Sequence, residues 1–289
     1  MNKPEILTVI VTYNAMRWLE RCLGSLRDSQ METDVIVVDN CSSDGTAEYI
    51  RKQYPSVMLV ENTENLGFGK ANNIGLRYAI DNGYDYVYLL NQDAWVFPDT
   101  FGHLVAAMEK HSEYGILSPV QMTASLESED RNFKLRCMSG RKRYEDGYIY
   151  DVDFVMAAHW MVSRKCLLTT GGFSPVFPHY GEDDDYVHRA LYHGFKVGFL
   201  MGTRAVHDRS DRSYDREMSM RRKLVTAKTR ICDPRRPFLI SMLLQPLEMA
   251  AMSLYHRSWT IFVSIFSLIR AYPSLYVGRK LSKETGAYL

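Results

Sequence analysis

Four short polar clusters in the first third of the chain carry residue types that can bind phosphate and a cation. In chain order they are Thr12-Tyr13-Asn14, residues 39–45 (DNCSSDG), residues 65–73 (NLGFGKANN) and Asn91-Gln92-Asp93. A Gly-rich turn that opens a helix suits phosphate, and a carboxylate such as that of Asp93 suits a metal ion. Taken singly, each cluster is also typical of a turn or a helix start.

A fifth cluster consists of four adjacent carboxylates, Glu182-Asp183-Asp184-Asp185, directly after Gly181. They repel one another, so the cluster needs a physical reason. One reason is that they start a helix, whose dipole favours negative charge at its N-terminus. The other is that one of them is a general base beside a bound cation. His207 is a candidate ligand, because Mg²⁺ and Mn²⁺ prefer oxygen but tolerate imidazole, although a lone histidine is more often structural.

The segments around the first four clusters alternate between strand and helix. Apolar runs predict strands at 7–13, 34–40, 57–60, 86–90 and 115–120, and helical spacing appears at 18–26, 71–80 and 98–111. This alternation predicts a doubly wound, mostly parallel α/β sheet. Ligands bind such sheets at the carboxyl ends of the strands. We therefore expect the four clusters to converge on one crevice.

After residue 120 the alternation is lost. Residues 121–150 are polar and charged, and we interpret them as a surface loop or a flap over the site. Strand character returns at 148–156, a helix is predicted over 182–193, and a further strand is predicted over 195–200. The chain thus divides into one unit over 1–210 and a helical extension over 211–289.

Overall composition excludes several classes of protein. With 35 Lys and Arg against 34 Asp and Glu, the net charge of +1 gives no indication of a nucleic-acid partner. A hydrophobic content of 46% argues against a disordered or disulfide-framework protein. Five cysteines without a CxxC pair favour a reducing, cytoplasmic setting. The N-terminal residues lack a signal-peptide pattern, and no uncharged apolar run reaches the ~18–20 residues of a spanning helix.

Together the clusters resemble family 2 of the glycosyltransferases, which are inverting enzymes with the A-type fold, and especially its rhamnosyltransferase and galactofuranosyltransferase branch. The matching strings are VIVTYN, VVDNCSSDGT, ENLGFGKANN, LLNQDA and GGFSPVFPHYGEDDDYVHRALYHG, followed by His207. The resemblance covers about two thirds of the chain. It implies a Rossmann-like nucleotide-binding sheet in a catalytic domain over 1–210. Residues 1–120 would be its nucleotide-sugar-binding half, and 121–210 its acceptor and catalytic half.

The resemblance also implies a role for individual residues. Those implied to bind the donor are Thr12, Tyr13, Asn14, Asp39, Asp44, Asn65, Gly67, Lys70, Asn91 and Gln92. Asp183, in the Glu-Asp-x-Asp pattern, matches the catalytic base, and Asp93 and His207 match the ligands of Mg²⁺ or Mn²⁺. Asn91 departs from the family's DxD metal motif, so one acidic ligand is missing. Trp160, Glu182 and Asp185 are expected to contact the acceptor.

The implied reaction moves a rhamnose-type sugar or a hexose from a dTDP- or UDP-linked donor. The implied acceptor is a glycan or a polyprenyl-linked glycan of bacterial surface polysaccharide synthesis. Inversion needs only one base, unlike the carboxylate pair of a glycosidase. Two alternatives remain, a non-catalytic nucleotide-sugar or glycan-binding module and a nucleotidyltransferase. The latter normally has a basic Gly-rich loop where this chain has Tyr13-Asn14-Ala15.

The last quarter of the chain has two apolar stretches, 237–247 and 258–269, between basic segments. They are either core helices that pack on the catalytic domain or an in-plane membrane attachment. In the second case, basic residues would face anionic lipid and three aromatic residues would lie in the interface. These are Arg221, Arg222, Lys223, Arg235, Arg236, Arg279, Lys280 and Lys283, with Trp259, Phe262 and Phe266. The protein is then either cytoplasmic or peripheral on the cytoplasmic face of the inner membrane.

Overall fold

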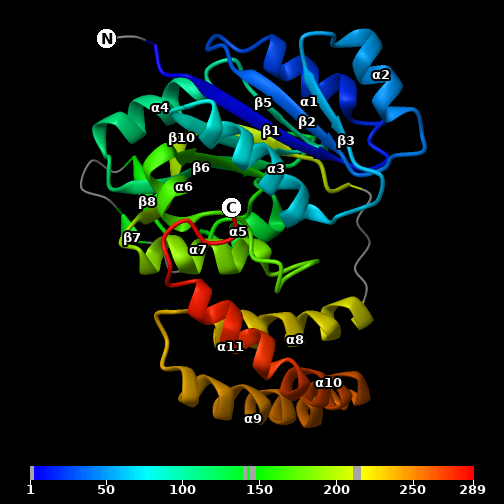
Figure 1. Ribbon diagram of the computed structural model, residues 1–289, viewed down its shortest axis with the longest axis vertical. Coiled ribbons are helices and arrows are strands. Elements are labelled where there is room, and N and C mark those ends of the chain that lie inside the picture. Colours follow the sequence, from blue (N-terminus) through cyan, green and yellow to red (C-terminus); the bar gives the residue numbers. More distant parts are fainter. Residues whose placement is uncertain (1–2, 139–141, 144–147, 211–215) are drawn as a thin grey trace.

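The structure is a computed structural model that describes residues 3–138, 142–143, 148–210 and 216–289. One mixed sheet forms the centre of its larger body, with the strand order β3-β2-β1-β4-β9-β6-β10-β8-β7 and β5 paired to β10 (Figure 1). The first four strands are β1 (Ile6–Thr12), β2 (Asp34–Asp39), β3 (Met58–Glu61) and β4 (Tyr86–Asn91). All four run parallel, as the sequence predicts.

Helices cover both faces of this sheet, which confirms the doubly wound α/β class. On one face lie α1 (Leu19–Arg27), α2 (Thr46–Gln53) and α4 (Thr100–Lys110), and on the other lie α3 (Phe68–Asp81), α6 (Arg164–Thr170) and α7 (Glu182–Tyr192). Alternate residues of β1 therefore enter different cores, Leu7 and Val9 on the α3 side and Ile6 and Ile10 on the α1 side. Burial on both faces explains why β1 is continuously apolar in sequence.

The second half of the sheet is mixed, so the parallel arrangement is less extensive than the sequence predicts. The strands there are β5 (Ala94–Val96), β6 (Tyr114–Met122), β7 (Lys142–Arg143), β8 (Ile149–Asp151), β9 (His159–Ser163) and β10 (Lys196–His207). Only β6 and β10 pair in parallel, and β9 is antiparallel to both β4 and β6.

The described part of the polar segment 121–150 contains regular structure. It contains α5 (Arg131–Arg136), which Asp130 caps by accepting a hydrogen bond from the backbone N–H of Phe133 at 2.8 Å. Phe133 is fully buried, so it anchors α5 to the sheet. Residues 139–141 and 144–147 of the expected flap lie outside the described residues. The strand expected over 148–156 is shorter, because residues 154–156 pack into the core instead.

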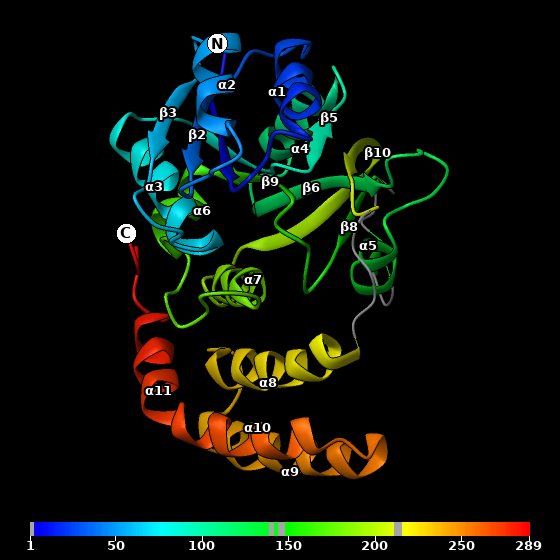
Figure 2. The ribbon, with the colours of Figure 1, turned by 90° about the vertical axis from the view of Figure 1, so that its right-hand side faces the viewer.

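The C-terminal residues form a separate layer of helices beneath the larger body (Figures 1 and 2). It consists of α8 (Arg216–Cys232), α9 (Phe238–His256), α10 (Trp259–Arg270) and α11 (Tyr272–Leu281). α9 and α10 pack on α8, whereas the chain end returns to the larger body. There Gly172 donates its N–H to the Ala287 carbonyl at 2.8 Å, and Gly286 donates to Thr169 at 2.9 Å. A side chain at Gly171 would collide with Ala287, so this turn requires glycine.

Candidate active site

The first two polar clusters meet at the carboxyl ends of β1 and β2, where Thr12 lies opposite Asp39. The Thr12 hydroxyl donates to Asp39 Oδ1 at 2.7 Å, and Ser42 donates to the same carboxylate through its N–H at 2.9 Å and its hydroxyl at 2.6 Å. Asp39 is buried, so these donors compensate the loss of water around its charge. The carboxylate is thereby held in one orientation at the edge of the sheet.

The loops after β1 and β2 are tied together by Asn14 and Asp44. Asn14 Oδ1 accepts from the Ser43 N–H at 2.9 Å, and Asp44 Oδ2 accepts from the Met16 N–H at 3.1 Å. Burial raises the pKa of Asp44, but hydrogen bonds from Thr46 and Met16 outweigh burial and leave its pKa below the ordinary value. Asp44 is therefore a charged link between two loops of the crevice.

The fourth cluster, Asn91-Gln92-Asp93, is hydrogen-bonded to the first cluster, Thr12-Tyr13-Asn14. Gln92 accepts from the Tyr13 N–H at 2.7 Å and donates to the Tyr13 carbonyl at 3.3 Å, so the side chain imitates a strand partner. Asn91 ends β4, and its buried Oδ1 has no hydrogen-bond partner among the described residues. This leaves one acceptor oxygen available beside the crevice.

Asn40 brings the third cluster to the second, although it was not among the predicted site residues. Its side chain donates to the Gly67 carbonyl at 3.3 Å and accepts from the Asn62 side chain at 2.9 Å. Asn65 in turn accepts from the Gly67 N–H at 2.9 Å. Gly67 has a positive φ of 78°, and a side chain there would lie 2.8 Å from the Pro178 carbonyl oxygen. Lys70 is exposed at the start of α3.

Asp93 and His207 lie together where β5 pairs with β10. Asp93 Oδ1 is 3.4 Å from His207 Nε2, and both side chains are almost fully buried. The backbone holds this pair in register, because His207 lies opposite Ala94 and the Asp208 N–H donates to the Asp93 carbonyl at 2.7 Å. Two neighbouring ligands of an octahedral cation, each about 2.1 Å from it, are about 3 Å apart. The spacing of the pair is close to that of two ligands of one Mg²⁺- or Mn²⁺-sized ion, which would have to displace the Arg209 N–H from His207 Nε2.

The protein supplies only part of a ligand set at this position. Across residues 3–138, 142–143, 148–210 and 216–289, no group of three or more His, Cys, Asp and Glu side chains is placed to hold a metal ion. A cation held by Asp93 and His207 would need its other ligands from a bound molecule or water. This agrees with the substitution of Asn91 for the first acidic residue of the family motif.

The four-carboxylate cluster forms the first turn of α7, after Gly181 in a left-handed conformation. Arg136 of α5 forms an ion pair with Asp184 at 2.7 Å and lies 3.6 Å from the centre of the Phe154 ring. Burial and repulsion from Asp183 raise the pKa of Glu182 to about 8 and that of Asp184 to about 7. Burial also raises the pKa of Asp183, against the opposing charge of Arg136.

Arg209 lies between the Asp93–His207 pair and the carboxylates of α7. Neither Arg209 nor Arg136 was predicted from the sequence. Arg209 Nε lies 3.4 Å from His207 Nε2 and 3.8 Å from the Asp130 carboxylate. The charge of Arg209 also lowers the pKa of Asp183. The Asp93–His207 pair and the α7 carboxylates therefore share one electrostatic environment, with α5 packed beside both.

The structure contradicts an acceptor-binding role for Trp160 and Asp185. Trp160 is fully buried in β9, and its ring stacks on Phe173 at 6.2 Å between centroids. Asp185 is buried too and forms an ion pair with Arg189 at 2.9 Å. Both predictions were wrong because a core aromatic and a structural carboxylate look like ligand contacts in sequence. Glu182 stays a candidate, since its buried Oε2 has no hydrogen-bond partner among the described residues.

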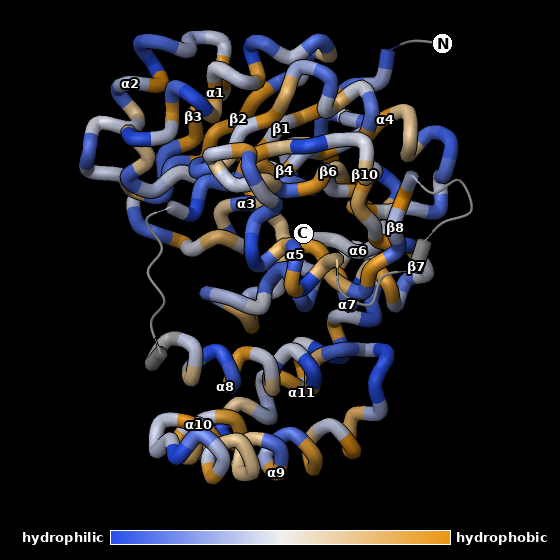
Figure 3. Tube along the Cα trace, turned by 180° about the vertical axis from the view of Figure 1, so that it is seen from behind, coloured by the Kyte–Doolittle hydropathy of each residue, from blue (hydrophilic) through white to orange (hydrophobic). Residues whose placement is uncertain are grey.

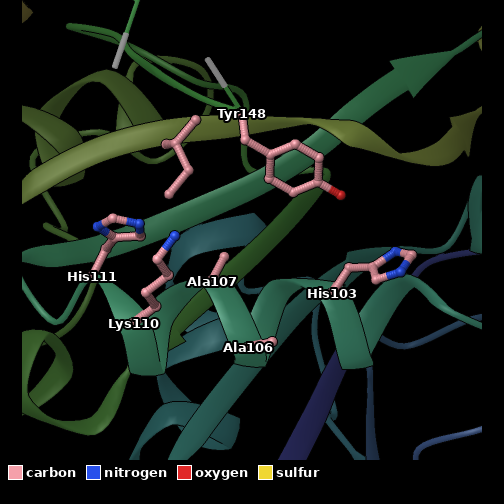
Figure 4. Close-up of a pocket in the computed structure, with 7 residues that line it drawn as sticks. His103, Ala106, Ala107, Lys110, His111 and Tyr148 are labelled. Carbon is pink, nitrogen blue, oxygen red and sulfur yellow. The ribbon is translucent and has the colours of Figure 1, made fainter. Parts of the chain in front are cut away.

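A separate cavity of about 360 Å³ lies between α4 and the segment that includes β8 (Figure 4). It is lined by His103, Ala106, Ala107, Lys110, His111, Tyr148 and Ile149. None of these residues belongs to the polar clusters, so the cavity is distinct from the candidate site at the strand ends.

Comparison with known proteins identifies the family. A family model described as glycosyl transferase family 2 matches residues 8–168, more than half of the chain. The chain belongs to glycosyl transferase family 2. The matched region contains the four strand-end clusters and β9, so it covers the crevice but not the carboxylates of α7.

Two curated relatives of this family 2 chain match over shorter segments. The undecaprenyl-phosphate mannosyltransferase of Micrococcus luteus is 36% identical over 106 residues, which is 36% of this chain and 44% of the relative. The N-acetylglucosaminyl-diphospho-decaprenol L-rhamnosyltransferase of Mycobacterium tuberculosis is 32% identical over 126 residues, 40% and 41% of the two chains. The chain thus spans less than half of the length of either relative.

Solved structures share the fold at low sequence identity. Staphylococcus aureus TarS 1–349 in complex with UDP has a TM-score of 0.60 and 14% identity, covering 96% of this chain and 88% of that one. The mannosyltransferase PcManGT from Pyrobaculum calidifontis, in complex with GDP-Man and Mn²⁺, has a TM-score of 0.59 and 19% identity, covering 95% and 76%. The family 2 chain therefore has the A-type glycosyltransferase fold.

Replacement of Asp185 by Asn is expected to reduce stability, not acceptor recognition. Arg189 is fully buried and donates to Asp185, Thr170 and Gly172, so the variant leaves its charge without a counter-ion. Breaking a buried pair in this way costs about 3–5 kcal/mol of unfolding free energy, measured by urea denaturation. The exposed Asp28→Asn variant is the control, with a loss of at most ~1 kcal/mol. A stable Asp185→Asn protein with a raised acceptor KM would restore the acceptor-binding role.

Proposed function

We propose that the chain is an inverting glycosyltransferase in which Asp183 activates an acceptor hydroxyl beside a donor held at the strand ends. The observation that carries this proposal is the common electrostatic environment of Asp183 and the Asp93–His207 pair, with Arg209 acting on both. A base close to a cation-binding pair, next to a crevice of amides and hydroxyls, suits transfer from a nucleoside diphosphate sugar.

The proposed donor pocket uses the strand-end clusters. Buried Asp39 already accepts hydrogen bonds from Thr12 and Ser42. The remaining lone pairs of its carboxylate oxygens would accept hydrogen bonds from the base or ribose. Tyr13, Asn14, Asn65, Gly67, Lys70, Asn91 and Gln92 would line the rest of the pocket, and Asp44 would hold its loops. Exposed Lys70 would approach the negative diphosphate. The close contact of Gly67 with Pro178 would bring the donor loop against the acceptor half.

Asp93 and His207 would hold Mg²⁺ or Mn²⁺ at this pocket. Their 3.4 Å separation supports the assignment, and PcManGT of the same fold was solved with Mn²⁺. When bound, such a cation would neutralise charge that develops on the leaving diphosphate. The two residues supply too few ligands alone, so donor and cation would bind together.

The base would act in one displacement. Ionised Asp183 takes the proton of an acceptor hydroxyl while that oxygen bonds to the anomeric carbon, opposite the diphosphate. The bond to the diphosphate breaks with its electron pair on the phosphate oxygen, so the configuration inverts. The first turn of α7 fixes the position of Asp183, and the Asp184 N–H donates to its carboxylate at 2.9 Å. Arg136 and Arg209 favour the ionised form that the reaction requires.

The relatives suggest the substrates. Their names specify mannosyl or rhamnosyl transfer to undecaprenyl phosphate or a decaprenol-linked sugar. We infer a rhamnose-type sugar or a hexose as the group transferred, from a dTDP- or UDP-linked donor. A glycan or polyprenyl-linked glycan of the bacterial surface would be the acceptor, reached at the cytoplasmic face of the inner membrane. The family match makes a nucleotidyltransferase or a non-catalytic module the less favoured alternative.

The Asp183→Asn variant should lose transfer and keep its donor. An amide cannot accept the proton, so kcat is expected to fall by about 10²–10⁴. A thermal-shift titration with UDP- and dTDP-sugars plus Mn²⁺ measures donor binding, which should raise the melting temperature of variant and parent alike. Asp28→Asn serves as the exposed control. Unchanged turnover in Asp183→Asn would exclude the base role, and a parent that binds the donor without turnover would favour the binding module.

The His207→Ala variant should weaken cation binding in the presence of the nucleotide. It removes one of the two protein ligands, so we expect the Kd of Mn²⁺ with UDP bound to rise at least about tenfold, or ~1.4 kcal/mol. Isothermal titration calorimetry measures this independently of turnover. His103→Ala is the control, because His103 is an exposed residue of α4 near Asp99. Equal Mn²⁺ affinity in His207→Ala and the parent would exclude the ligand role.

Loss of Arg136 should shift the pH dependence of transfer. The positive charge of Arg136 lowers the pKa of Asp183, so Arg136→Met should raise that pKa. Transfer needs the ionised carboxylate, and the acidic limb of the kcat profile should therefore move to higher pH. A profile from pH 4 to pH 9 checks this, with exposed Arg27→Met as the control. A uniform loss of kcat with an unmoved limb would mean that Arg136 only supports the fold.

A further inference from the structure

The helices α9 and α10 lie side by side at the far end of the molecule, with α8 between them and the sheet (Figure 2). Their inward side chains form a small core with α8, for example Met249 and Ile261 against Ile231. No other described helix or strand lies beyond α9 and α10, on the side away from α8, in either view (Figures 1 and 2). The outermost layer thus has one packed face and one open face.

The open face is apolar. On α9 it carries Leu239, Leu243, Leu247 and Leu254, and on α10 it carries Trp259, Phe262, Phe266 and Ile269. Their exposed fractions range from 38% at Phe262 to 80% at Leu254. Spacings of three, four or seven residues place them in a stripe along each helix, and apolar segments recur along both helices in Figure 3. Soluble monomers rarely leave so large an apolar surface uncovered.

The charges around this face are almost all positive. Residues 235–283 contain seven Lys and Arg but one carboxylate, Glu248, which forms an ion pair with Arg230 at 2.5 Å. Arg257, Arg270 and Lys280 are exposed. Arg279, expected from the sequence to face lipid, is buried instead, and Arg235 and Arg236 form ion pairs with Asp233. Arg221, expected from the sequence to join them, lies outside the described side chains. A second copy of the same face would bring these cations together without carboxylates to pair them, whereas anionic lipid head groups would neutralise them.

We propose that the outer face of α9 and α10 docks in the plane of an anionic lipid bilayer. An apolar stripe with basic borders is the pattern of a helix that lies in the head-group region. Among the described residues, α9 is long and apolar enough to cross a membrane, with 17% of its most apolar 18-residue window buried, and α10 and α11 reach that length only together, across a bend of 59°. Crossing would remove α9 from α8 and place Glu248 and the inward Gln245 in hydrocarbon, which is costly.

This orientation would also place the active site relative to the membrane. α8 touches α7 on its other side, where a side chain at Gly181 would lie 2.7 Å from Val225 and where His188 is 3.9 Å from Asp233. Packed helices have axes about 8–10 Å apart, so two such contacts put α7 about 20 Å from the outer layer. Docking itself is independent of the proposed function, but this consequence rests on it. A lipid-linked acceptor would meet Asp183 at that height.

Sedimentation of the full chain with vesicles tests the proposal. We expect the protein to pellet with phosphatidylcholine vesicles that contain 30% phosphatidylglycerol, less with pure phosphatidylcholine, and less again in 0.5 M NaCl. A Leu243→Gln, Leu247→Gln variant should lose at least tenfold in vesicle affinity, because both side chains are exposed and apolar. Leu168→Gln, an exposed leucine of α6, is the matched control and should bind like the parent.

Three results would overturn the proposal. The first is equal sedimentation of the Leu243→Gln, Leu247→Gln variant and the parent. The second is that neither protein binds vesicles, while light scattering shows a concentration-dependent dimer of the parent that is lost in the variant. That result would mean that the face binds a second copy of the chain. The third is resistance of the bound protein to alkaline carbonate, which would indicate a spanning α9. Thermal-shift donor binding, expected to be unchanged in the variant, separates failure of docking from failure of the proposed chemistry.

Discussion

Four carboxylates in a single helical turn are the constraint on which the rest of the site depends. Like charges this close, partly or fully buried, would open the first turn of α7 unless each were compensated. The compensation differs for each group. Asp185 has the buried guanidinium of Arg189, Asp184 has Arg136, and Glu182 is raised in pKa to about 8 and so holds a proton at neutral pH. Asp183 accepts a hydrogen bond from the Asp184 N–H at 2.9 Å, and the charges of Arg136 and Arg209 lower its pKa.

The need to compensate each carboxylate separately explains why so many side chains are bonded to α7. Arg189 also donates to the Thr170 and Gly172 carbonyls, so it ties the base helix to the turn after α6. The same turn reaches α3, because Asn73 accepts from the Phe173 N–H at 2.7 Å and donates to its carbonyl at 2.9 Å. α3 begins at the donor loop. The start of α3 and the first turns of α7 are therefore linked through one set of hydrogen bonds around the turn after α6.

The sequence predicts the first half of the fold well and the second half less well, for a physical reason. Strands buried on both faces, such as β1, are continuous apolar runs, and the residues that follow them are exposed to ligand at the sheet edge. Local patterns do not reveal that β9 inserts between β4 and β6. The same limit affects the site. Trp160 and Asp185 have the residue types of ligand contacts, and only tertiary packing shows that they are structural, whereas Arg136 and Arg209 stand in polar segments without a motif.

α8 connects the outer helices α9 and α10 to α7, because it packs against both. One side of α8 packs against Gly181, directly before α7, while its other side supplies the core under α9 and α10. A force on the outer helices is therefore transmitted to α7 through one packed layer. Close packing makes such a layer stiff, because side chains in a core have few alternative positions. If the outer face lies on a bilayer, the height and tilt of α7 above the lipid follow from this packing.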